Sequence, residues 1–109
     1  MDLLEIETLA NDLMHQHGLE CYEIRLSNMF MAAGRCLYYS KTIKLSAPVL
    51  LMMPEHEIRD TILHEIAHAL VGPGFGHSKY WKDTARRIGC TGKRCYDRSK
   101  MSHDNFGSK

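Results

Sequence analysis

The sequence contains no long hydrophobic run, and its first residues do not predict a secretory signal. Its longest apolar stretch, residues 47–53, is interrupted by Pro48 and is far too short to cross a bilayer. The first residues include Asp2, Glu5 and Glu7, whereas a secretory signal has a basic segment followed by an apolar one. We therefore expect no membrane span and a cytoplasmic protein.

The chain has four cysteines, which could pair in three ways in an oxidising compartment. Because the sequence predicts no export signal, we expect the four cysteines to be thiols, with metal ligation as the alternative. They are Cys21, Cys36, Cys90 and Cys95. The chain of 109 residues is long enough for one domain with a single modest core. Apolar periodicity fades after Cys90, so we expect residues 1–97 to form the domain and residues 98–109 a mobile basic tail.

Net charge is small, but its distribution is uneven. The chain carries 14 Lys and Arg against 13 Asp and Glu, a net charge of +1. Residues 1–78 hold five basic and ten acidic side chains, whereas residues 79–109 hold nine basic and three acidic ones. The basic C-terminal third is a candidate surface for DNA or another polyanion, and a solvated tail would have the same composition.

Helical apolar spacing occurs in three segments, and short alternating segments lie between the first two. Helices are predicted over residues 3–17, ended by Gly18, over about 55–71, and from the N-cap Ser78 to Gly89. The segments CYEIRL, RCLYYS and TIKLS predict three strands of a small sheet. This order predicts an α+β domain with an N-terminal helix, a three-stranded sheet, a central helix and a C-terminal helix.

The central helix has the most regular pattern. Large apolar residues recur every four positions and are expected to pack on the core. They are Ile58, Ile62, Ile66 and Leu70, widened by Leu63 and Ala67. Before this helix, residues 46–56 are expected to be a connection whose leucines and methionines pack on the core, with Pro54 opening the helix. Gly34 is expected to let another backbone approach closely.

Two histidines and a glutamate lie on the polar side of the central helix, in the motif HEIAH. Because each residue advances by about 100°, His64 and His68 lie one turn apart and within roughly 40° of each other. Two such imidazoles suit one Zn²⁺, which in a catalytic site has three protein ligands and a fourth position for water. Glu65 is placed to accept a proton from that water, the chemistry of an H-E-x-x-H motif.

A third ligand is needed, and His77 is the favoured candidate. It follows the glycine-rich segment VGPGFG, which allows the chain to reverse and return a ring to the first two. The alternatives are His56, Glu57 and Asp60. The predicted site consists of the metal ligands His64, His68 and His77 and the general base Glu65.

These segments together resemble the SprT-like family of zinc metallopeptidases, which includes the Spartan type of DNA-protein crosslink protease. The resemblance rests on AAGRCLYYSKTIKLS, PEHEIRDTILHEIAHAL, GFGHSKYWK and a helix ending RRIG, about residues 30–90. It implies a small zincin-like domain whose central helix is the active-site helix. It further implies Zn²⁺ as cofactor and a protein or peptide substrate, with DNA-associated proteins among the expected substrates.

Two features of the chain are not explained by this resemblance. Larger family members often carry a zinc ribbon with two cysteine pairs, whereas here only Cys90 and Cys95 remain. Two thiolates do not fill a structural zinc site, so we interpret the pair as part of a loop. The group that steadies the oxyanion stays open among Arg35, Tyr38, Tyr39 and Tyr80.

The main competing hypothesis is a non-catalytic zinc-binding interaction module for a protein or nucleic-acid partner. Glu65 favours the enzyme, because a structural site has no need of a carboxylate between its ligands. A metal-free nucleic-acid-binding domain conflicts with the acidic balance of residues 1–78. A zinc nucleobase deaminase would need an H-x-E and a P-C-x-x-C motif, and this pair is missing.

Overall fold

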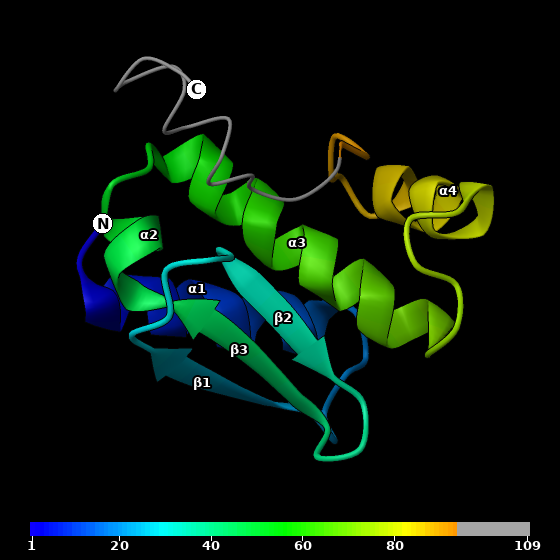
Figure 1. Ribbon diagram of the computed structural model, residues 1–109, viewed down its shortest axis with the longest axis horizontal. Helices are drawn as coiled ribbons and strands as arrows, with labels where there is room; N and C mark the ends of the chain where they lie inside the picture. The colour runs from blue at the N-terminus through cyan, green and yellow to red at the C-terminus, as the bar shows by residue number, and fades with distance from the viewer. Residues whose placement is uncertain (94–109) are drawn as a thin grey trace.

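The computed structural model describes residues 1–93 (Figure 1). The elements follow in the order α1 (Leu3–Gln16), β1 (Glu23–Ser27), β2 (Gly34–Leu37), β3 (Thr42–Ser46), α2 (Ala47–Leu51), α3 (Glu55–Val71) and α4 (Lys79–Arg87). One sheet with separate helices makes an α+β fold, as predicted. Across residues 1–93, no helix combines the length and apolar character that crossing a membrane would require. The predicted domain end near residue 97 and the tail lie outside the described residues.

The helices end where the sequence predicted, and glycine geometry is the reason. Gly18 and Gly89 have φ angles of 77° and 102°, a left-handed conformation that other residues rarely adopt. After each glycine the chain bonds back to the helix: Leu19 N–H donates to the Met14 carbonyl at 2.9 Å, and Cys90 N–H to the Ala85 carbonyl at 2.9 Å. Both ends are therefore Schellman caps that redirect the chain.

The three predicted strands form one sheet in the order β1-β3-β2. β2 pairs with β3 as an antiparallel hairpin, and β1 pairs with the other side of β3 in parallel. The tight turn between β2 and β3 places Lys41 at a φ of 51°. β2 therefore lies at one edge of the sheet. The strand positions were predicted, but the order was not, because the alternating pattern is the same for every pairing.

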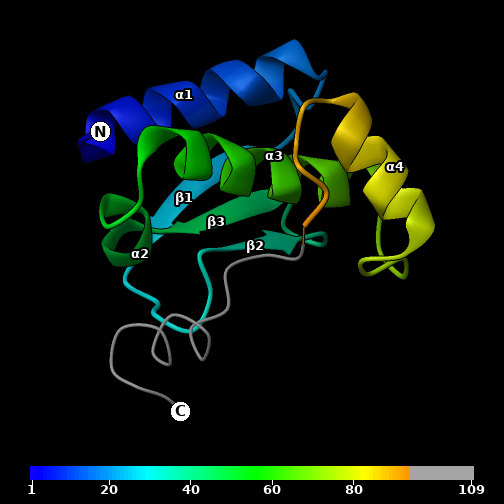
Figure 2. The same cartoon turned by 90° about the horizontal axis from the view of Figure 1, so that it is seen from above.

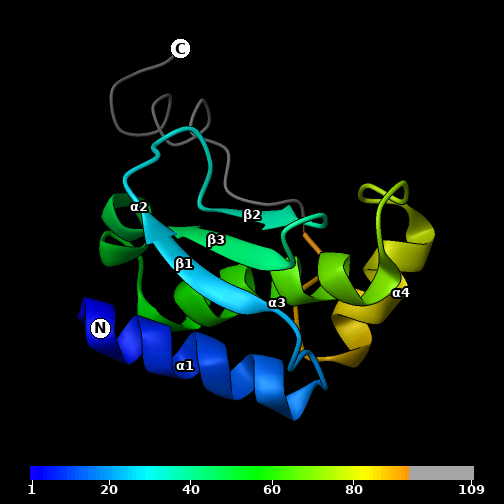
Figure 3. The same cartoon turned by 90° about the horizontal axis from the view of Figure 1, so that it is seen from below.

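α1 and α3 lie side by side over one face of the sheet (Figures 2 and 3). α1 contacts β1, and α3 contacts β2 and also packs against α4. The largest fully buried side chains gather between these elements, from all parts of the chain. They include Ile6, Ile43, Leu45, Leu50, Ile58, Ile62, Ile66 and Trp81, each 0% exposed. One side of α3 packs into this core, and another side faces the edge strand β2 and α4.

The predicted connection before α3 contains the short helix α2, which the sequence analysis did not anticipate. Ser46 caps it, because its side chain accepts a hydrogen bond of 3.1 Å from the Val49 N–H. Leu50 is fully buried, but Leu51 and Met52 are 49% and 57% exposed. The expectation that all these side chains pack on the core was wrong, because one helical turn has only one inward side.

The predicted stripe of α3 is buried except at its last member. Ile58, Ile62 and Ile66 are fully buried, whereas Leu70 is 38% exposed. A step of four residues overshoots a full turn by about 40°, so three steps rotate Leu70 by roughly 120° from Ile58. Including Leu70 in the core was wrong for this reason.

The difference in burial between the Ile62 and Leu70 side chains predicts a difference in the stability of their alanine variants. Ile62→Ala should lower the free energy of unfolding by about 2–5 kcal/mol, because it opens a cavity in the core. Leu70→Ala should cost less than about 1 kcal/mol, because the side chain keeps much of its contact with water. Urea denaturation of both variants tests this pair, and equal losses would contradict the assigned burial.

Candidate metal centre

α3 places two histidines and one glutamate between the sheet edge and α4. His64 and His68 lie one turn apart, on the side of α3 away from the buried isoleucines. His64 is 2% exposed and Glu65 is 3% exposed, while His68 is partly exposed. Polar side chains this deeply buried have a specific structural or chemical role, because burial without a partner is costly.

The loop between α3 and α4 returns a third histidine to this side. Gly72, Gly74 and Gly76 have φ angles of 88°, 94° and 51°, which glycine adopts without strain. The loop ends at Ser78, whose side chain accepts a hydrogen bond of 3.4 Å from the Trp81 N–H and caps α4. His77 therefore lies immediately before the cap, where the rigid start of α4 fixes its backbone.

The three histidines meet at one point. The Nε2 atom of His77 lies 3.0 Å from Nε2 of His64 and 3.2 Å from Nε2 of His68. The ligand atoms of all three lie within 4.8 Å of one another. Two nitrogens bound tetrahedrally to Zn²⁺ at about 2.0–2.1 Å would be roughly 3.3 Å apart, so the arrangement fits one such ion.

The alternative ligands do not join this cluster. The side chains of His56 and Glu57 are 81% and 56% exposed and contact each other at 3.9 Å. Asp60 accepts hydrogen bonds from Thr91 instead. Within residues 1–93, the three histidines form the only group of metal-binding side chains gathered in this way.

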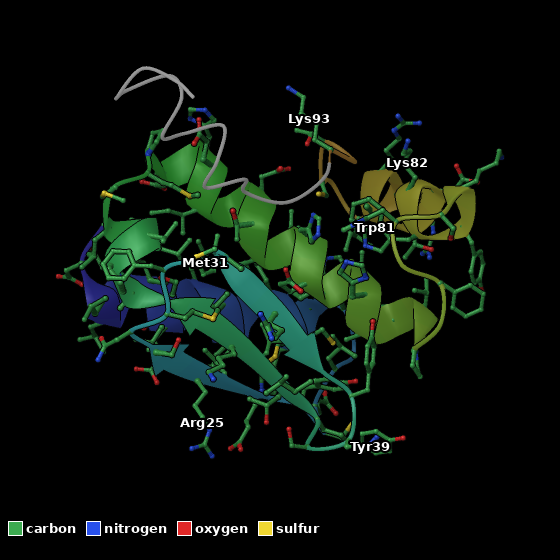
Figure 4. The ribbon with its side chains drawn as sticks, viewed as in Figure 1. Arg25, Met31, Tyr39, Trp81, Lys82 and Lys93 are labelled. Carbon is green, nitrogen blue, oxygen red and sulfur yellow. The ribbon has the colours of Figure 1, made fainter. Side chains whose placement is uncertain are left out.

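Trp81 of α4, labelled in Figure 4, contacts all three histidine rings. Its ring centroid lies 4.6 Å from that of His64, 5.1 Å from that of His68, where the rings stack, and 4.7 Å from that of His77. Its indole N–H donates a hydrogen bond of 3.3 Å to the His64 carbonyl. The sequence predicted Trp81 only as a buried face of the last helix. The spacing of four residues between His77 and Trp81 was the sequence feature that could have indicated this contact.

Glu65 lies beside the cluster and against the edge strand. Its Oε2 is 4.0 Å from Nε2 of His64. A Cβ atom on Gly34 of β2 would lie 3.0 Å from Cγ of Glu65, a contact so tight that the Glu65 side chain would have to shift. The close approach predicted at Gly34 is therefore made by the Glu65 side chain and not by another backbone. Glycine at this position leaves room for the carboxylate.

Burial changes the protonation of these groups. It lowers the pKa of His64 to about 3, with further lowering by His68 and His77. It also lowers the pKa of His68 to about 4, with His77 adding to the effect. Both rings are therefore neutral near pH 7, which is the form that binds a metal. Burial raises the pKa of Glu65 to about 8 in the metal-free protein, and Arg35 partly opposes this.

The backbone of Lys93 supplies a further contact to the cluster. Its hydrogen bonding to the His64 ring partly opposes the lowering of the His64 pKa by burial, the effect expected of a ring N–H that donates to a carbonyl. Because Nε2 of His64 faces the other two rings, Nδ1 is the nitrogen left for this bond. Lys93 is not among the predicted site residues, because nothing in the local sequence pattern relates it to His64.

The cluster opens into a pocket of about 200 Å³. Its lining includes Gly34, Arg35, Cys36, Tyr38, His64, Glu65, His68 and His77. Two of the four side chains considered as oxyanion donors, Arg35 and Tyr38, line it, whereas Tyr39 is fully exposed and Tyr80 is not in the lining. Burial raises the pKa of Tyr38 to about 12, so its hydroxyl keeps its proton at neutral pH.

The described cysteines, Cys21, Cys36 and Cys90, are free thiols. Cys90 is 5% exposed and packs at the end of α4, with its Sγ 3.6 Å from the Asp60 carbonyl oxygen. Cys95 lies outside the described residues, so the interpretation of Cys90 and Cys95 as a loop pair stays a prediction.

Residues 4–103 match the SprT-like family. Among similar proteins are the DNA-dependent metalloproteases SPRTN of Bos taurus and Homo sapiens, each 36% identical over 73 residues. The aligned segment is 62% of this chain and 15% of each relative. The chain thus spans a small part of the length of these relatives.

Two crystal structures have a similar fold. The metallopeptidase zymogen jannalysin of Methanocaldococcus jannaschii has a TM-score of 0.67 at 20% identity, covering 79% of this chain and 83% of that one. The zymogen abylysin of Pyrococcus abyssi has a TM-score of 0.62 at 18% identity, covering 94% of this chain and 97% of that one. These likenesses confirm the predicted zincin-like α+β fold, and at such identities they extend to the fold alone.

The raised pKa of Glu65 predicts how the stability of the metal-free protein varies with pH. A carboxyl group whose folded pKa is about 8, against an ordinary value of 4.5, stabilises the fold below the ordinary value, and this stabilisation is lost as pH rises through 8. Metal-free Glu65→Gln should therefore lose less stability than the wild type between about pH 5.5 and about pH 8.5.

Urea unfolding in the presence of a chelator measures this difference. The histidines are common to both proteins, so their own titration cancels in the comparison. Glu57→Gln, at a partly exposed position on the same helix, should behave as the wild type. An equal loss of stability in the wild type and Glu65→Gln would show that the Glu65 carboxyl titrates normally.

Proposed function

Because this chain belongs to the SprT-like family, as its motifs predicted, we propose that it is a zinc-dependent metallopeptidase. His64, His68 and His77 hold the metal, and Glu65 is the general base. The observation that carries this proposal is the convergence of three imidazoles on one point, with their ligand atoms within 4.8 Å, beside a buried carboxylate. The chain spans 15% of the SPRTN relatives, so their whole activity does not transfer with the fold.

Each residue of the site has a role in this reaction. When bound, zinc would supply Lewis-acid activation of water and polarisation of the scissile carbonyl. Glu65 takes a proton from the attacking water and later delivers it to the leaving amine. Its carboxyl group has little contact with solvent, and Gly34 leaves it the space to reach the pocket.

Arg35 and Tyr38 are the proposed donors to the oxyanion. Both line the pocket that contains the histidines and Glu65. Tyr38 remains a hydroxyl donor across the physiological range because its pKa is raised to about 12. Preorganised donors of this kind stabilise the charge that develops during attack on a carbonyl.

A protein or peptide substrate suits the edge strand beside the pocket. β2 pairs with β3 on one side only, and within residues 1–93 no strand pairs with its other side. Gly34, Arg35 and Cys36 of this strand line the pocket. An extended peptide laid along β2 would receive main-chain hydrogen bonds and pass in front of Glu65.

DNA contact is proposed for α4 and the segment that follows it. Lys79, Lys82 and Arg86 are spaced by three and four residues and therefore share one side of the helix. Lys93 extends this basic side, since Lys82 and Lys93 lie toward the same edge of the molecule (Figure 4). The similarity to proteins named DNA-dependent metalloproteases supports this assignment.

Metal content and hydrolysis test the main proposal. The wild-type protein should hold about one zinc per chain, as an open three-histidine site does. His77→Ala should lose most of it, because two imidazoles on one helix leave the ion under-coordinated. Glu65→Gln should keep the zinc and lower hydrolysis of an unfolded protein substrate by at least about 100-fold, because only the proton transfer is removed.

His56→Ala is the matched control, because His56 is the exposed alternative ligand on the same helix. It should keep both zinc and activity. Zinc that persists in His77→Ala, or is lost in His56→Ala, would refute the assigned ligands. A wild-type protein that holds zinc but cleaves no protein, with or without DNA, would favour the non-catalytic interaction module.

Charge reversal on α4 tests DNA contact separately. Lys82→Glu combined with Arg86→Glu should weaken DNA binding and reduce the dependence of log affinity on log salt by roughly 1 to 2, because two phosphate contacts are lost. Fluorescence anisotropy with labelled DNA at several salt concentrations measures both quantities. Arg25→Glu combined with Lys44→Glu reverses a cross-strand pair elsewhere, in β1 and β3, and should have little effect. Equal effects of the two double variants would contradict a contact through α4.

A further inference from the structure

The segment that follows α4 is tied to α3 by a set of hydrogen bonds centred on Asp60. The Thr91 N–H donates to Oδ1 of Asp60 at 2.7 Å, and the Thr91 hydroxyl donates to Oδ2 at 3.0 Å. The Asp60 backbone carbonyl also accepts a contact from the Cys90 thiol at 3.6 Å. Both carboxylate oxygens of Asp60 are therefore engaged by one residue of this segment.

This segment, residues 90–93, leaves the end of α4 and crosses over α3 (Figures 1 and 2). Gly89 turns the chain out of α4, and the buried Cys90 holds it against the core. Asp60 and His64 are four residues apart on α3, about 6 Å along the helix axis. Thr91 and Lys93 are two residues apart, at most about 7 Å along the chain, and the Lys93 N–H donates a hydrogen bond of 3.3 Å to the Thr91 hydroxyl. Fixing Thr91 at Asp60 therefore brings Lys93 level with His64.

At that level the backbone of Lys93 forms its hydrogen bond with the His64 ring. The Lys93 side chain points away from the protein (Figure 4), so its backbone is the part that faces α3. A histidine that donates from Nδ1 to a carbonyl keeps Nε2 unprotonated, which is the nitrogen that faces His77. Such partners fix both the tautomer and the orientation of a metal-binding ring.

We propose that Asp60 and Thr91 are positioning residues for the metal centre. By anchoring the segment of residues 90–93, they hold the Lys93 carbonyl against Nδ1 of His64 and present Nε2 of that ring to the metal. This proposal rests on the zinc site of the proposed function and adds residues outside the H-E-x-x-H motif to it. Asp60, considered from sequence as a ligand, acts on the metal through His64.

Zinc affinity and the tautomer of His64 test this proposal. Thr91→Val removes the two hydrogen bonds of the Thr91 hydroxyl but keeps the bond from the Thr91 N–H to Asp60, whereas Asp60→Ala removes both bonds to the Asp60 carboxylate. Competition with a chromophoric chelator should show zinc affinity lowered by about 10- to 100-fold in Asp60→Ala, and by a smaller factor in Thr91→Val. Thr91→Ser keeps the hydroxyl and should restore wild-type affinity. Asp83→Ala, at an exposed position paired with Lys79 on α4, is the control and should bind zinc as the wild type does.

Nitrogen NMR of the metal-free proteins separates positioning from general destabilisation. In the wild type, His64 should be a single tautomer protonated at Nδ1. In Asp60→Ala and Thr91→Val it should become a mixture of tautomers while the other resonances show an intact fold. Loss of stability alone would not move this signal. If Asp60→Ala fails to fold, Thr91→Val gives the same two readouts.

The outcomes distinguish this proposal from the proposed function. Folded variants whose zinc affinity stays within twofold of the wild type, with His64 still protonated at Nδ1, would overturn the positioning role and leave the metallopeptidase intact. A wild-type protein that binds no zinc would overturn both. Weakened zinc binding together with a mixed His64 tautomer, rescued by Thr91→Ser, would establish the role of the segment.

Discussion

Three imidazole nitrogens must meet at one point, and the rest of the structure serves that requirement. Two of the rings come from α3 and need only helical spacing. The third arrives by way of a loop with three glycines at positive φ, which returns the chain so that α4 can begin directly after His77. Trp81 then packs against all three rings, so the same helix that ends the loop also supports the cluster.

Burial gives this arrangement its chemistry. Desolvation keeps His64 and His68 neutral and disfavours the charged form of Glu65 in the metal-free protein. A divalent cation among the rings would reverse the effect at Glu65, because a nearby positive charge stabilises the carboxylate. The protonation state of Glu65 therefore depends on whether a metal is bound by the neighbouring histidines. His56 is exposed and lies apart from the cluster, so it does not take part in this dependence.

The errors of the sequence analysis have identifiable physical causes. The prediction that Leu70 is buried is wrong because a four-residue period drifts by about 40° at each step and leaves one side of a helix after three steps. α2 was missed because five residues are too few for a periodic pattern. Gly34 was correctly identified as a point of close approach, but which group approaches depends on how β2 packs against α3. A single glycine in the sequence does not identify the residue that will pack against it.

By itself, the sequence determined the helices and strands, the H-E-x-x-H pair and the return of His77, because spacing, caps and glycines act over a few residues. Only the tertiary structure decided the strand order, the place of Trp81 beneath the rings, and the link from Asp60 through Thr91 and Lys93 to His64. The Trp81 contact with His64 joins residues 17 positions apart, and the link between Asp60 and Thr91 joins residues 31 positions apart. No local pattern encodes such contacts, because packing around a common core creates them.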